Sequence, residues 1–379
     1  MSMFTIVADS NIAHLHDYFN EKNLKQPVNV ITMAGRDITA DVLQQHQPDT
    51  LLIRSVTQIT PQLLDSNSSV KFIGSATIGT DHVNEGYVSL RGMRFVNAAG
   101  CSKHSVAQYV MTAILQLRPE YWSDDANKSD KPVKLGIIGL GNIGTTLARY
   151  ALDLGWEVLG YDPFQSRNVI NNASFDEVIS NSDVISLHVP LTLPGYSELP
   201  TQHMINSAVL EKMPADTMLI NTSRGAVVNE ADLLANLDKN SERQVVLDVF
   251  EHEPTVSAEL IDKLAIATPH IAGYTVEGKL RGTQMIFDSF ARSYGPKGAD
   301  VLDIEPMALM DDLLPDNPYQ WQQLKENPQQ LTEFYDIKGD DKLLRDSVDS
   351  SEQAVPAKAF DALRKNYALR REWLFNTRQ

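Results

Sequence analysis

The stretch Lys134-Leu-Gly-Ile-Ile-Gly-Leu-Gly-Asn-Ile-Gly144 decides how the chain folds. Its first half is a short apolar run, which is typical of a buried strand. Gly139, Gly141 and Gly144 follow with the spacing G-x-G-x-x-G, and the residues after them have a helical pattern. A strand, a tight turn and a helix in this order predict the first part of a βαβ unit, and therefore a parallel sheet.

The same stretch indicates a dinucleotide. Glycines allow the backbone to turn tightly and to approach a pyrophosphate, whose charge is favoured at a helix N-terminus. The next apolar run ends at Asp162, where a carboxylate would accept hydrogen bonds from the adenosine ribose and repel a 2′-phosphate. A glycine turn near an unrelated surface aspartate is the alternative, but the strand–turn–helix context favours NAD.

Short apolar runs alternate with amphipathic segments on both sides of this motif. This alternation predicts an α/β fold with two doubly wound parallel sheets, separated by a helix at residues 105–117. The polar, proline-closed residues 119–132 predict a crossing between domains. The expected strands are residues 4–9, 29–33, 51–55, 71–76 and 94–98, followed by 134–141, 157–162, 183–190, 217–222, 244–249 and 265–270.

The chain changes character beyond about residue 300, where prolines and glutamines become frequent. Residues 359–373 predict a helix, because Phe360, Leu363, Tyr367 and Trp373 form an apolar stripe at helical spacing. We expect a small third domain here.

The composition excludes several classes of protein. The 379 residues carry a formal net charge of −16, which argues against general nucleic-acid binding and against anionic membrane surfaces. Cys101 is the single cysteine, so no intrachain disulfide can form and a reducing compartment fits. Neither a signal peptide nor a membrane-length apolar run is recognisable, and we expect a cytoplasmic protein.

Polar side chains with catalytic potential follow three expected strands. Arg224 could hold a substrate carboxylate through paired donors, and His270 could take a hydroxyl proton as a general base. Glu253 could bond to the other ring nitrogen of His270 and orient the ring. Each residue alone has an ordinary structural explanation, but together, after a nucleotide motif, they indicate the oxidation of a hydroxy acid.

The stretches GLGNIG, INTSRGAVV, LDVFEHEP and TPHIAGYT resemble the D-isomer-specific 2-hydroxyacid dehydrogenase family. The catalytic arginine, glutamate and histidine of that family match Arg224, Glu253 and His270. LLIRSVTQI, KFIGSATIGTDHV, HIAGYTVEGKLRGT and FDALRKNYALRREW resemble one branch of it, which has an extra C-terminal domain. The resemblance implies a small phosphorylated hydroxy acid as substrate and a homodimer formed through the C-terminal domain.

The resemblance also implies a division of the chain. Residues 1–110 and 275–300 would form a flavodoxin-like substrate domain, 111–274 a Rossmann NAD domain, and 301–379 an α+β dimerisation domain. It implies substrate contacts at Ser55, Thr77 and Tyr274, whose hydroxyls could bind carboxylate or phosphate oxygens or serve turns and caps instead. It implies cofactor contacts, together with the motif, at Gly139, Gly141, Asn142, Ile143, Gly144, Asp162, Thr222, Ser223, Arg224, Asp248 and Gly273. No metal is implied.

Some positions depart from the family or stay ambiguous. Val189 stands where a relative has threonine, so only a backbone contact to the cofactor could remain there. Lys103 and His104 replace small or neutral residues, and they either add positive charge near a phosphate or simply begin a helix. Arg54 is either a phosphate partner or a surface charge.

Two other functions stay open. The chain could be another D-2-hydroxyacid dehydrogenase of the phosphoglycerate or hydroxypyruvate type, because the Arg–Glu–His set does not separate these enzymes. It could also be an NADH-sensing, corepressor-like protein. The acidic charge and the lack of a basic tail argue against the second alternative.

Overall fold

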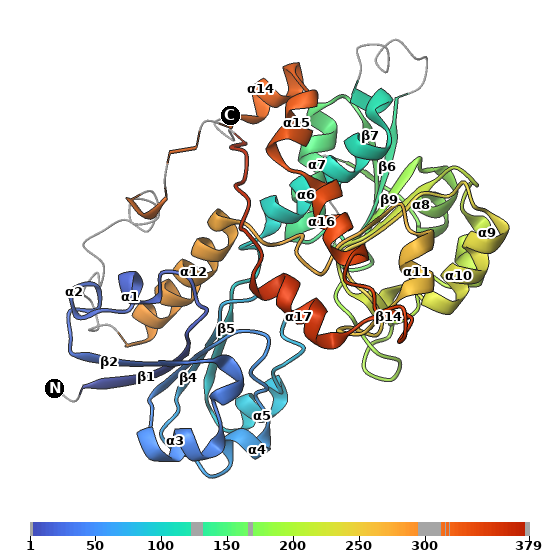
Figure 1. Cartoon of the computed structure of the whole chain (residues 1–379). Helices are drawn as coiled ribbons and strands as arrows, with labels where there is room; N and C mark the ends of the chain where they lie inside the picture. The colour runs from blue at the N-terminus through green and yellow to red at the C-terminus, as the bar shows by residue number, and fades with distance from the viewer. Residues whose placement is uncertain are drawn as a thin grey trace. The chain divides into compact units, whose positions relative to one another are not determined.

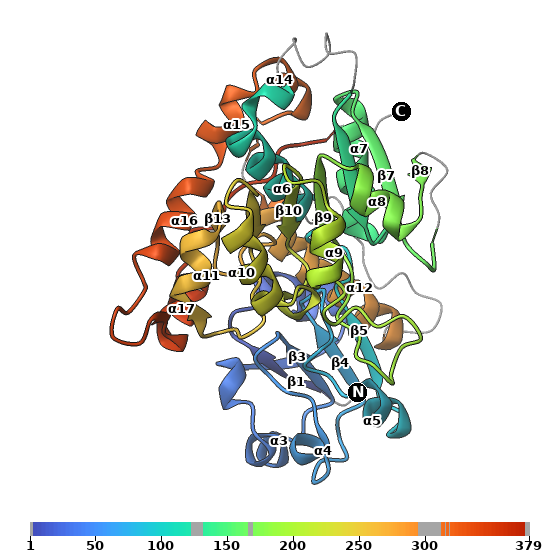
Figure 2. The ribbon, with the colours of Figure 1, turned by 90° about the vertical axis from the view of Figure 1, so that its right-hand side faces the viewer.

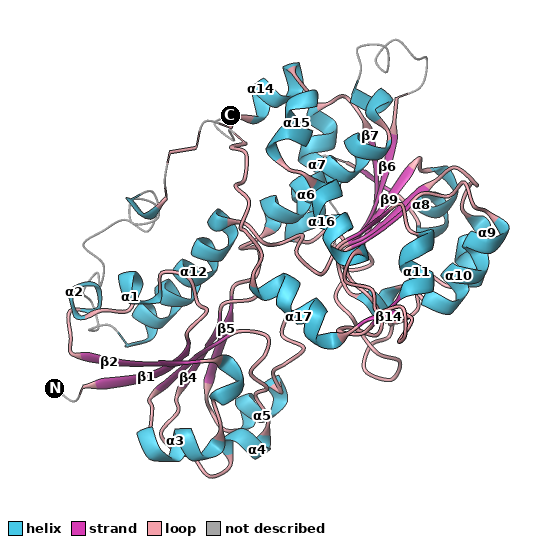
Figure 3. Cartoon of the chain, viewed as in Figure 1, coloured by secondary structure: helices cyan, strands magenta, loops and turns pink. Residues whose placement is uncertain are grey.

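The structure is a computed structural model that describes residues 3–122, 132–165, 170–294, 312–314, 316–317 and 319–375. The chain forms two compact units, drawn in Figures 1 and 3. One consists of Met1–Ser102 and Thr275–Asp316, and the other of Lys103–Tyr274 and Asn317–Gln379. The predicted crossing at residues 119–132 lies mostly outside the described residues.

The first unit is built on a five-stranded parallel sheet in the order β2-β1-β3-β4-β5. This is the flavodoxin-like order, and all five strands were predicted from the apolar runs. The strands are β1 (Phe4–Asp9), β2 (Val28–Met33), β3 (Thr50–Ile53), β4 (Phe72–Ser75) and β5 (Arg94–Asn97).

Helices cover both faces of this sheet because successive side chains of a strand point to opposite sides. Ile6 and Ala8 pack in one cluster with residues of α1, α2 and α12, whereas Val7 packs in another with residues of α3, α4 and α5. Figure 1 shows the two helical layers. The helices are α1 (Leu15–Tyr18), α2 (Glu21–Leu24), α3 (Ala40–His46), α4 (Pro61–Leu64), α5 (Glu85–Leu90) and α12 (Val276–Tyr294).

The second unit contains a seven-stranded parallel sheet in the order β13-β11-β10-β9-β6-β7-β8. The strand order reverses next to β6, the strand of the glycine motif, as in a Rossmann sheet. The predicted fold class is therefore confirmed. The strands are β6 (Lys134–Ile138), β7 (Glu157–Tyr161), β8 (Asn171–Asn172), β9 (Val184–Leu187), β10 (Met218–Asn221), β11 (Val245–Leu247) and β13 (Ile266–Ala267).

Two groups of helices sandwich the second sheet. One apolar cluster joins the sheet to α6 and α7, and another joins its opposite side chains to α8, α9, α10 and α11. Within the described residues, none of the helices combines the length and the apolar character that a membrane crossing requires. The helices are α6 (Lys103–Leu117), α7 (Asn142–Asp153), α8 (Phe175–Asn181), α9 (Ser207–Lys212), α10 (Glu230–Lys239) and α11 (Ala258–Lys263).

The C-terminal region shares the cores of the second unit. Trp321, Tyr335 and Trp373 belong to the cluster of α6 and α7, while Leu344 and Phe360 belong to that of α8 to α11. The Asp341 carboxylate accepts a bond from the backbone N–H of Ala267 in β13, and Figure 2 shows α16 beside that strand. The elements are α14 (Trp321–Glu326), α15 (Gln329–Phe334), α16 (Ile337–Arg345), β14 (Ala354–Val355) and α17 (Ala357–Lys365).

The predicted helix at residues 359–373 is wrong beyond its first half. α17 ends at Lys365, and the chain then runs without helix to Trp373, whose ring stacks on Trp321 with centroids 5.8 Å apart. The backbone of Leu374 exchanges hydrogen bonds with Tyr319 and Trp321. These inter-segment bonds satisfy the backbone groups that a helix would otherwise pair. The aromatic cluster buries Trp373, so its burial does not require that it lie on the apolar face of a helix.

Candidate active site

The glycine motif forms the turn that its spacing predicts. Gly139 has a φ of +96°, and a Cβ there would lie 2.4 Å from the carbonyl oxygen of His188. A Cβ on Gly144 would lie 2.0 Å from the carbonyl oxygen of Gly139, so the helix packs tightly against the turn. Gly141 precedes α7, and a Cβ on it would meet nothing within 4 Å. The turn therefore has open space beside a helix N-terminus, which fits a pyrophosphate.

Asp162 follows β7 and is tied to this turn. One carboxylate oxygen accepts a hydrogen bond from the backbone N–H of Leu140 at 2.9 Å. The other accepts bonds from the N–H groups of Phe164 and Gln165 at 2.9 and 3.1 Å. A carboxylate has about four acceptor positions, so Asp162 keeps capacity for a ribose hydroxyl.

The residues predicted after β10 lie at the same sheet edge as the glycine turn, because the strands are parallel. The hydroxyl of Thr222 is buried and has no hydrogen-bond partner among the described residues. A buried unpaired hydroxyl is costly, and a bound cofactor would supply its partner. Ser223 instead donates its hydroxyl to Asn221, and Arg224 is partly buried with one guanidinium nitrogen 2.7 Å from the Ser223 carbonyl oxygen.

The structure brings Glu253 and His270 together. The Nδ1 atom of His270 lies 2.8 Å from Oε2 of Glu253, and the other carboxylate oxygen accepts a bond from the backbone N–H of Phe250 at 2.9 Å. No described residue bonds to Nε2 of His270. The pair therefore presents one ring nitrogen that is oriented by a carboxylate and one that is open to a substrate.

The charge of Glu253 is set by opposing effects. Burial pulls the pKa of Glu253 upward, but the charge and hydrogen bond of His270, the N–H of Phe250 and the charge of Arg364 together hold that pKa below its usual value. The carboxylate is consequently ionised at neutral pH, as a group that stabilises an imidazolium must be.

Asp248, which was predicted as a cofactor contact, holds the loop of His270. One carboxylate oxygen accepts bonds from the Thr268 hydroxyl at 2.7 Å and the Ile271 N–H at 2.8 Å, and the other accepts the Ala272 N–H at 2.9 Å. Burial raises the pKa of Asp248 to about 6, although His270 and these donors oppose the shift. His270 itself has a φ of +56° within this loop.

Ser55 and Thr77 follow the neighbouring strands β3 and β4 at one edge of the first sheet. Ser55 is exposed, and the partly buried Thr77 donates its hydroxyl to the Gly79 carbonyl oxygen and lies 2.7 Å from the Ser75 hydroxyl. Tyr274 belongs to the second unit, where the Arg364 guanidinium lies 3.4 Å from its hydroxyl oxygen.

The positions that depart from the family, and three of the predicted cofactor contacts, also belong to the second unit. Val189 packs partly buried against the core of α8 to α11. Lys103 and His104 begin α6, and His104 lies 3.1 Å from the Tyr150 hydroxyl. Asn142 is exposed at the start of α7, and its neighbour Ile143 is partly buried, as is Gly273 in the loop of His270.

Several residues around the site were not predicted. The hydroxyl of Tyr109 in α6 lies 2.6 Å from that of Thr268, and the guanidinium of Arg370 donates to the loop of His270. His188, at the end of β9, has a buried Nδ1 without a partner among the described residues. Burial lowers the pKa of His188 to about 3. His188 lies within the expected strand at residues 183–190, so its position could have been found, whereas nothing near Arg370 in the sequence signals its contact.

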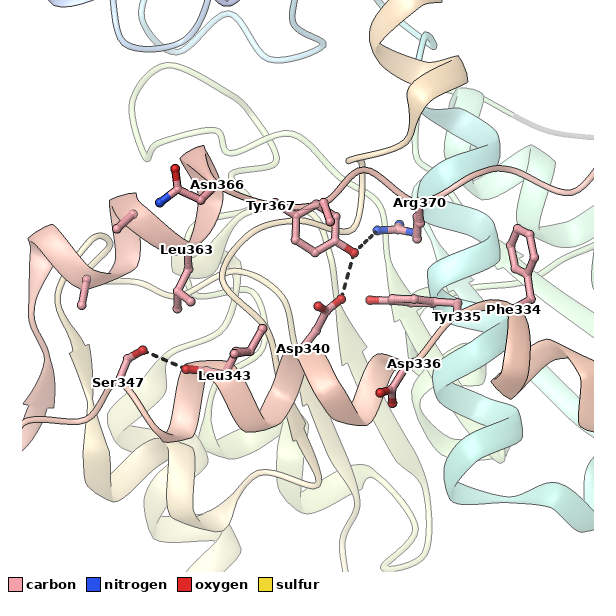
Figure 4. A pocket seen from close by; sticks show the side chains of 13 residues that line it. Phe334, Tyr335, Asp336, Asp340, Leu343, Ser347, Leu363, Asn366, Tyr367 and Arg370 are labelled. Atoms are coloured by element: carbon pink, nitrogen blue, oxygen red, sulfur yellow. Dashed lines mark hydrogen bonds between the residues drawn. The ribbon is translucent and has the colours of Figure 1, made fainter. Parts of the chain in front are cut away.

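A separate pocket of about 650 Å³ lies in the C-terminal region and is drawn in Figure 4. Its lining combines apolar side chains of α16 and α17 with Asp340, Tyr367 and Arg370. None of the predicted site residues lines it, so this pocket is distinct from the sheet edge described above.

The sheet order, the glycine turn and the histidine–glutamate pair define a nucleotide-dependent dehydrogenase. Residues 105–272 match the family model described as D-isomer specific 2-hydroxyacid dehydrogenase, NAD binding domain, and residues 316–376 match Domain of unknown function (DUF3410). NAD is therefore the cofactor, as the sequence predicted.

Curated relatives are similar over nearly the whole chain. An erythronate-4-phosphate dehydrogenase of Psychrobacter sp. (strain PRwf-1) is 79% identical, covering 99% of this chain and 100% of the relative. One from Acinetobacter baumannii (strain ACICU) is 42% identical, covering 97% of each. The chain belongs to the erythronate-4-phosphate dehydrogenases, a branch of the D-isomer specific 2-hydroxyacid dehydrogenase family.

A solved structure extends the comparison. The D-lactate dehydrogenase of Aquifex aeolicus, complexed with NAD and lactic acid, is 27% identical with a TM-score of 0.61. It covers 75% of this chain, and 94% of its own length is matched. A quarter of the present chain is therefore additional to the fold that the two proteins share.

Proposed function

We propose that the chain oxidises the C2 hydroxyl of 4-phospho-D-erythronate with NAD, giving (R)-3-hydroxy-2-oxo-4-phosphooxybutanoate for pyridoxine 5′-phosphate biosynthesis. The observation that carries this proposal is the 79% identity to an erythronate-4-phosphate dehydrogenase over 99% of the chain. That similarity includes the C-terminal region, which is the part least expected in a general 2-hydroxyacid dehydrogenase.

His270 is the proposed general base. Glu253 occupies Nδ1 at 2.8 Å, which leaves Nε2 to accept the proton of the substrate hydroxyl. The hydrogen on C2 leaves as a hydride, with both electrons of the C2–H bond. The O–H bond breaks at the same time, and its electron pair stays with oxygen and forms the C2=O carbonyl. NAD, when bound, supplies the acceptor for the hydride. The ionised Glu253 stabilises the imidazolium that forms.

Arg224 is the proposed anchor of the substrate carboxylate. A guanidinium binds a carboxylate through two parallel donors, which fixes both the position and the rotation of the carboxylate. The chain carries a net charge of −16, so an anionic substrate needs such a local cation. Ser55, Thr77 and Tyr274 are proposed to bind further substrate oxygens, and the predicted cofactor residues, including Asp162 and Thr222, to hold NAD.

A direct assay tests the substrate. We would follow NADH formation at 340 nm with 4-phospho-D-erythronate and, in parallel, with 3-phospho-D-glycerate. A 2-oxo acid is added to a second set of reactions that detect the product, in case NADH is retained. Preference for 4-phospho-D-erythronate supports the proposal, and preference for 3-phospho-D-glycerate would replace the substrate while keeping the catalytic roles.

We also propose a cytoplasmic homodimer formed through residues 301–379. This rests on the family resemblance and on the single cysteine, Cys101, which is buried and has no second cysteine in the chain with which to form a disulfide. Light scattering after gel filtration distinguishes a dimer from a monomer of 42.2 kDa. A monomer at micromolar concentration would contradict the proposal.

A further inference from the structure

The C-terminal region contacts the loop that carries His270. Both belong to the second compact unit, so these contacts lie within one body. The contacts come from a short segment, Arg364 to Arg370, which begins in the last turn of α17. The Arg364 guanidinium lies 3.4 Å from the Tyr274 hydroxyl oxygen, and the rings of Tyr367 and Tyr274 meet edge to face with centroids 6.1 Å apart.

Arg370 makes the most extensive of these contacts. Its guanidinium donates to the carbonyl oxygens of Ile271, at 2.9 Å, and of Ala272, and it reaches the carbonyl of Ser105 in α6 at 3.2 Å. It therefore joins the loop to α6. Arginine suits this task because its fork of donors is rigid and always charged.

The guanidinium of Arg370 is itself held in place. It lies over the Tyr335 ring, 4.6 Å from the centroid, and 3.4 Å from the Tyr367 hydroxyl. Figure 4 shows that hydroxyl between Arg370 and Asp340, to which Tyr367 donates at 2.9 Å. Arg370 is thus positioned by Tyr335, which follows α15, and by Tyr367, which follows α17 and is itself held by Asp340 of α16.

Two side chains hold the loop of His270, one through its backbone N–H groups and the other through its carbonyl oxygens. Asp248 accepts the N–H groups of Ile271 and Ala272, and Arg370 binds the carbonyl oxygens of the same two residues. Fixing the N–H donors and the carbonyl acceptors of two consecutive residues holds three successive peptide groups, which leaves little freedom for the preceding residue. That residue is His270, whose backbone is in the left-handed region at a φ of +56°.

We propose that Arg370 is a positioning residue for His270, and that the C-terminal domain supports catalysis within its own chain. The inference rests on the proposed function, since it takes His270 as the base. Loss of Arg370 releases the carbonyl oxygens of Ile271 and Ala272, and the imidazole then samples orientations in which Nε2 misses the substrate hydroxyl. A shift of about 1 Å in a catalytic group can cost roughly 100-fold in rate.

The test compares Arg370→Ala and Arg370→Lys with a matched control, Arg345→Ala. Arg345 belongs to the same C-terminal region and also binds two carbonyl oxygens, those of Ile261 at 2.7 Å and Leu264 at 2.9 Å. Ile261 and Leu264 lie at the end of α11, and neither hydrogen-bonds to the loop at residues 268–274. The control therefore removes an equivalent anchor from the same unit.

We expect Arg370→Ala to lower kcat roughly 30- to 100-fold while KM for NAD and for the hydroxy acid changes less than about threefold. Arg370→Lys keeps the positive charge but not the forked guanidinium, and its kcat should fall less than that of Arg370→Ala. Guanidinium ion added at millimolar concentration should restore part of the kcat of Arg370→Ala. Arg345→Ala should keep kcat within about twofold, with a fall in thermal stability similar to that of Arg370→Ala.

Three results would overturn the inference. These are an unchanged kcat in Arg370→Ala, an equal fall of kcat in Arg345→Ala, or an Arg370→Ala variant in which only KM changes. If wild-type protein ignores 4-phospho-D-erythronate but oxidises another 2-hydroxy acid, the proposed substrate fails. The Arg370 comparison is then made with that acid, so the two failures are distinguishable. If Arg370→Ala does not fold, Arg370→Lys with the same kcat-against-KM comparison decides the question.

Discussion

At the scale of single residues, the backbone at His270 is unusual but not unique. His203 has a φ of +52° and lies 2.5 Å from Glu251 through Nε2, so it too combines a left-handed backbone with a carboxylate partner. What distinguishes His270 is its place after β13 at the edge of the second sheet and its attachment to Asp248. Strain of this kind persists only where the surroundings impose it.

This similarity allows a matched test of the general base. His270→Gln should lower kcat by about 100- to 10,000-fold, the range that general acid–base catalysis supplies, while the Kd for NAD stays nearly unchanged. His203→Gln replaces a histidine of similar geometry and should keep kcat within about twofold. Steady-state kinetics and calorimetric titration with NAD measure both quantities. An equal loss in the two variants would point to backbone strain instead of proton transfer.

The sequence predicted the histidine and its glutamate partner, because their neighbours have distinctive spacing after strands. It did not predict what Asp248 binds. A carboxylate after a strand can face a cofactor or the backbone of the next loop, and only the fold of residues 268–272 decides between them. Arg370 lies 99 and 98 positions along the chain from Ile271 and Ala272, which it contacts, and a lone arginine at that distance carries no signal.

At the scale of elements, the glycine turn contains positions with different requirements. Gly139 needs its residue type for the fold, since a Cβ would lie 2.4 Å from a carbonyl oxygen and its φ is +96°. Gly141 has open space on the same test and a φ of −70°, which any residue adopts. A substitution at Gly139 should therefore mainly lower stability, whereas a substitution at Gly141 should mainly weaken cofactor binding.

Gly139→Ala should lower the free energy of unfolding by about 1–3 kcal/mol, because it combines strain with a backbone clash. Gly141→Ala should unfold like the wild type yet bind NAD at least about tenfold more weakly, because the methyl group occupies the space we assign to the pyrophosphate. Urea unfolding and NAD titration measure the two effects. Wild-type NAD affinity in Gly141→Ala would show that this space is not used.

The end of β9 gives a prediction for pH. The pKa of His188 falls to about 3 in the folded chain, against about 6.5 when unfolded, so its stabilising contribution is present above pH 6.5 and is lost as the pH falls toward 3. Between pH 7.5 and 5.0 this amounts to about 2 kcal/mol. His188→Gln should lack that part of the pH dependence in urea unfolding. Parallel curves for both proteins would mean that His188 is not neutral in the fold.

Predicted elements succeeded where apolar runs were long enough to mark a strand. β8, β12 (Val256–Ser257) and β14 have two residues each, and they were not predicted because no apolar run marks them. β13 is equally short, but it was predicted within the run at residues 265–270. The helix at residues 359–373 was extended too far because an apolar stripe does not show whether the backbone finds other partners. Here the strand-like pairing of Leu374 with residues 319–321 provided them.

At the scale of the whole molecule, the C-terminal region depends on the second unit for its burial. Trp373 is 2% exposed and packs among aromatic residues of that unit, whereas the adjacent Leu374 is 40% exposed. Trp373→Ala should lower the free energy of unfolding by about 3–5 kcal/mol, as the loss of a buried aromatic does. Leu374→Ala should cost less than about 1 kcal/mol. A single unfolding transition that shifts in Trp373→Ala would show that the region and the sheet unfold together, and a separate early transition would contradict this.

The pairing of β14 with β12 has a consequence for the order in which the site forms during synthesis. β12 begins three residues after Glu253, and Arg370 binds the loop of His270, so both halves of the proposed catalytic pair are braced by segments that follow them in the chain. A ribosome makes every predicted site residue before it makes either brace. The nascent chain can thus complete its glycine turn early, while the proton-transfer geometry waits for residues 354–370.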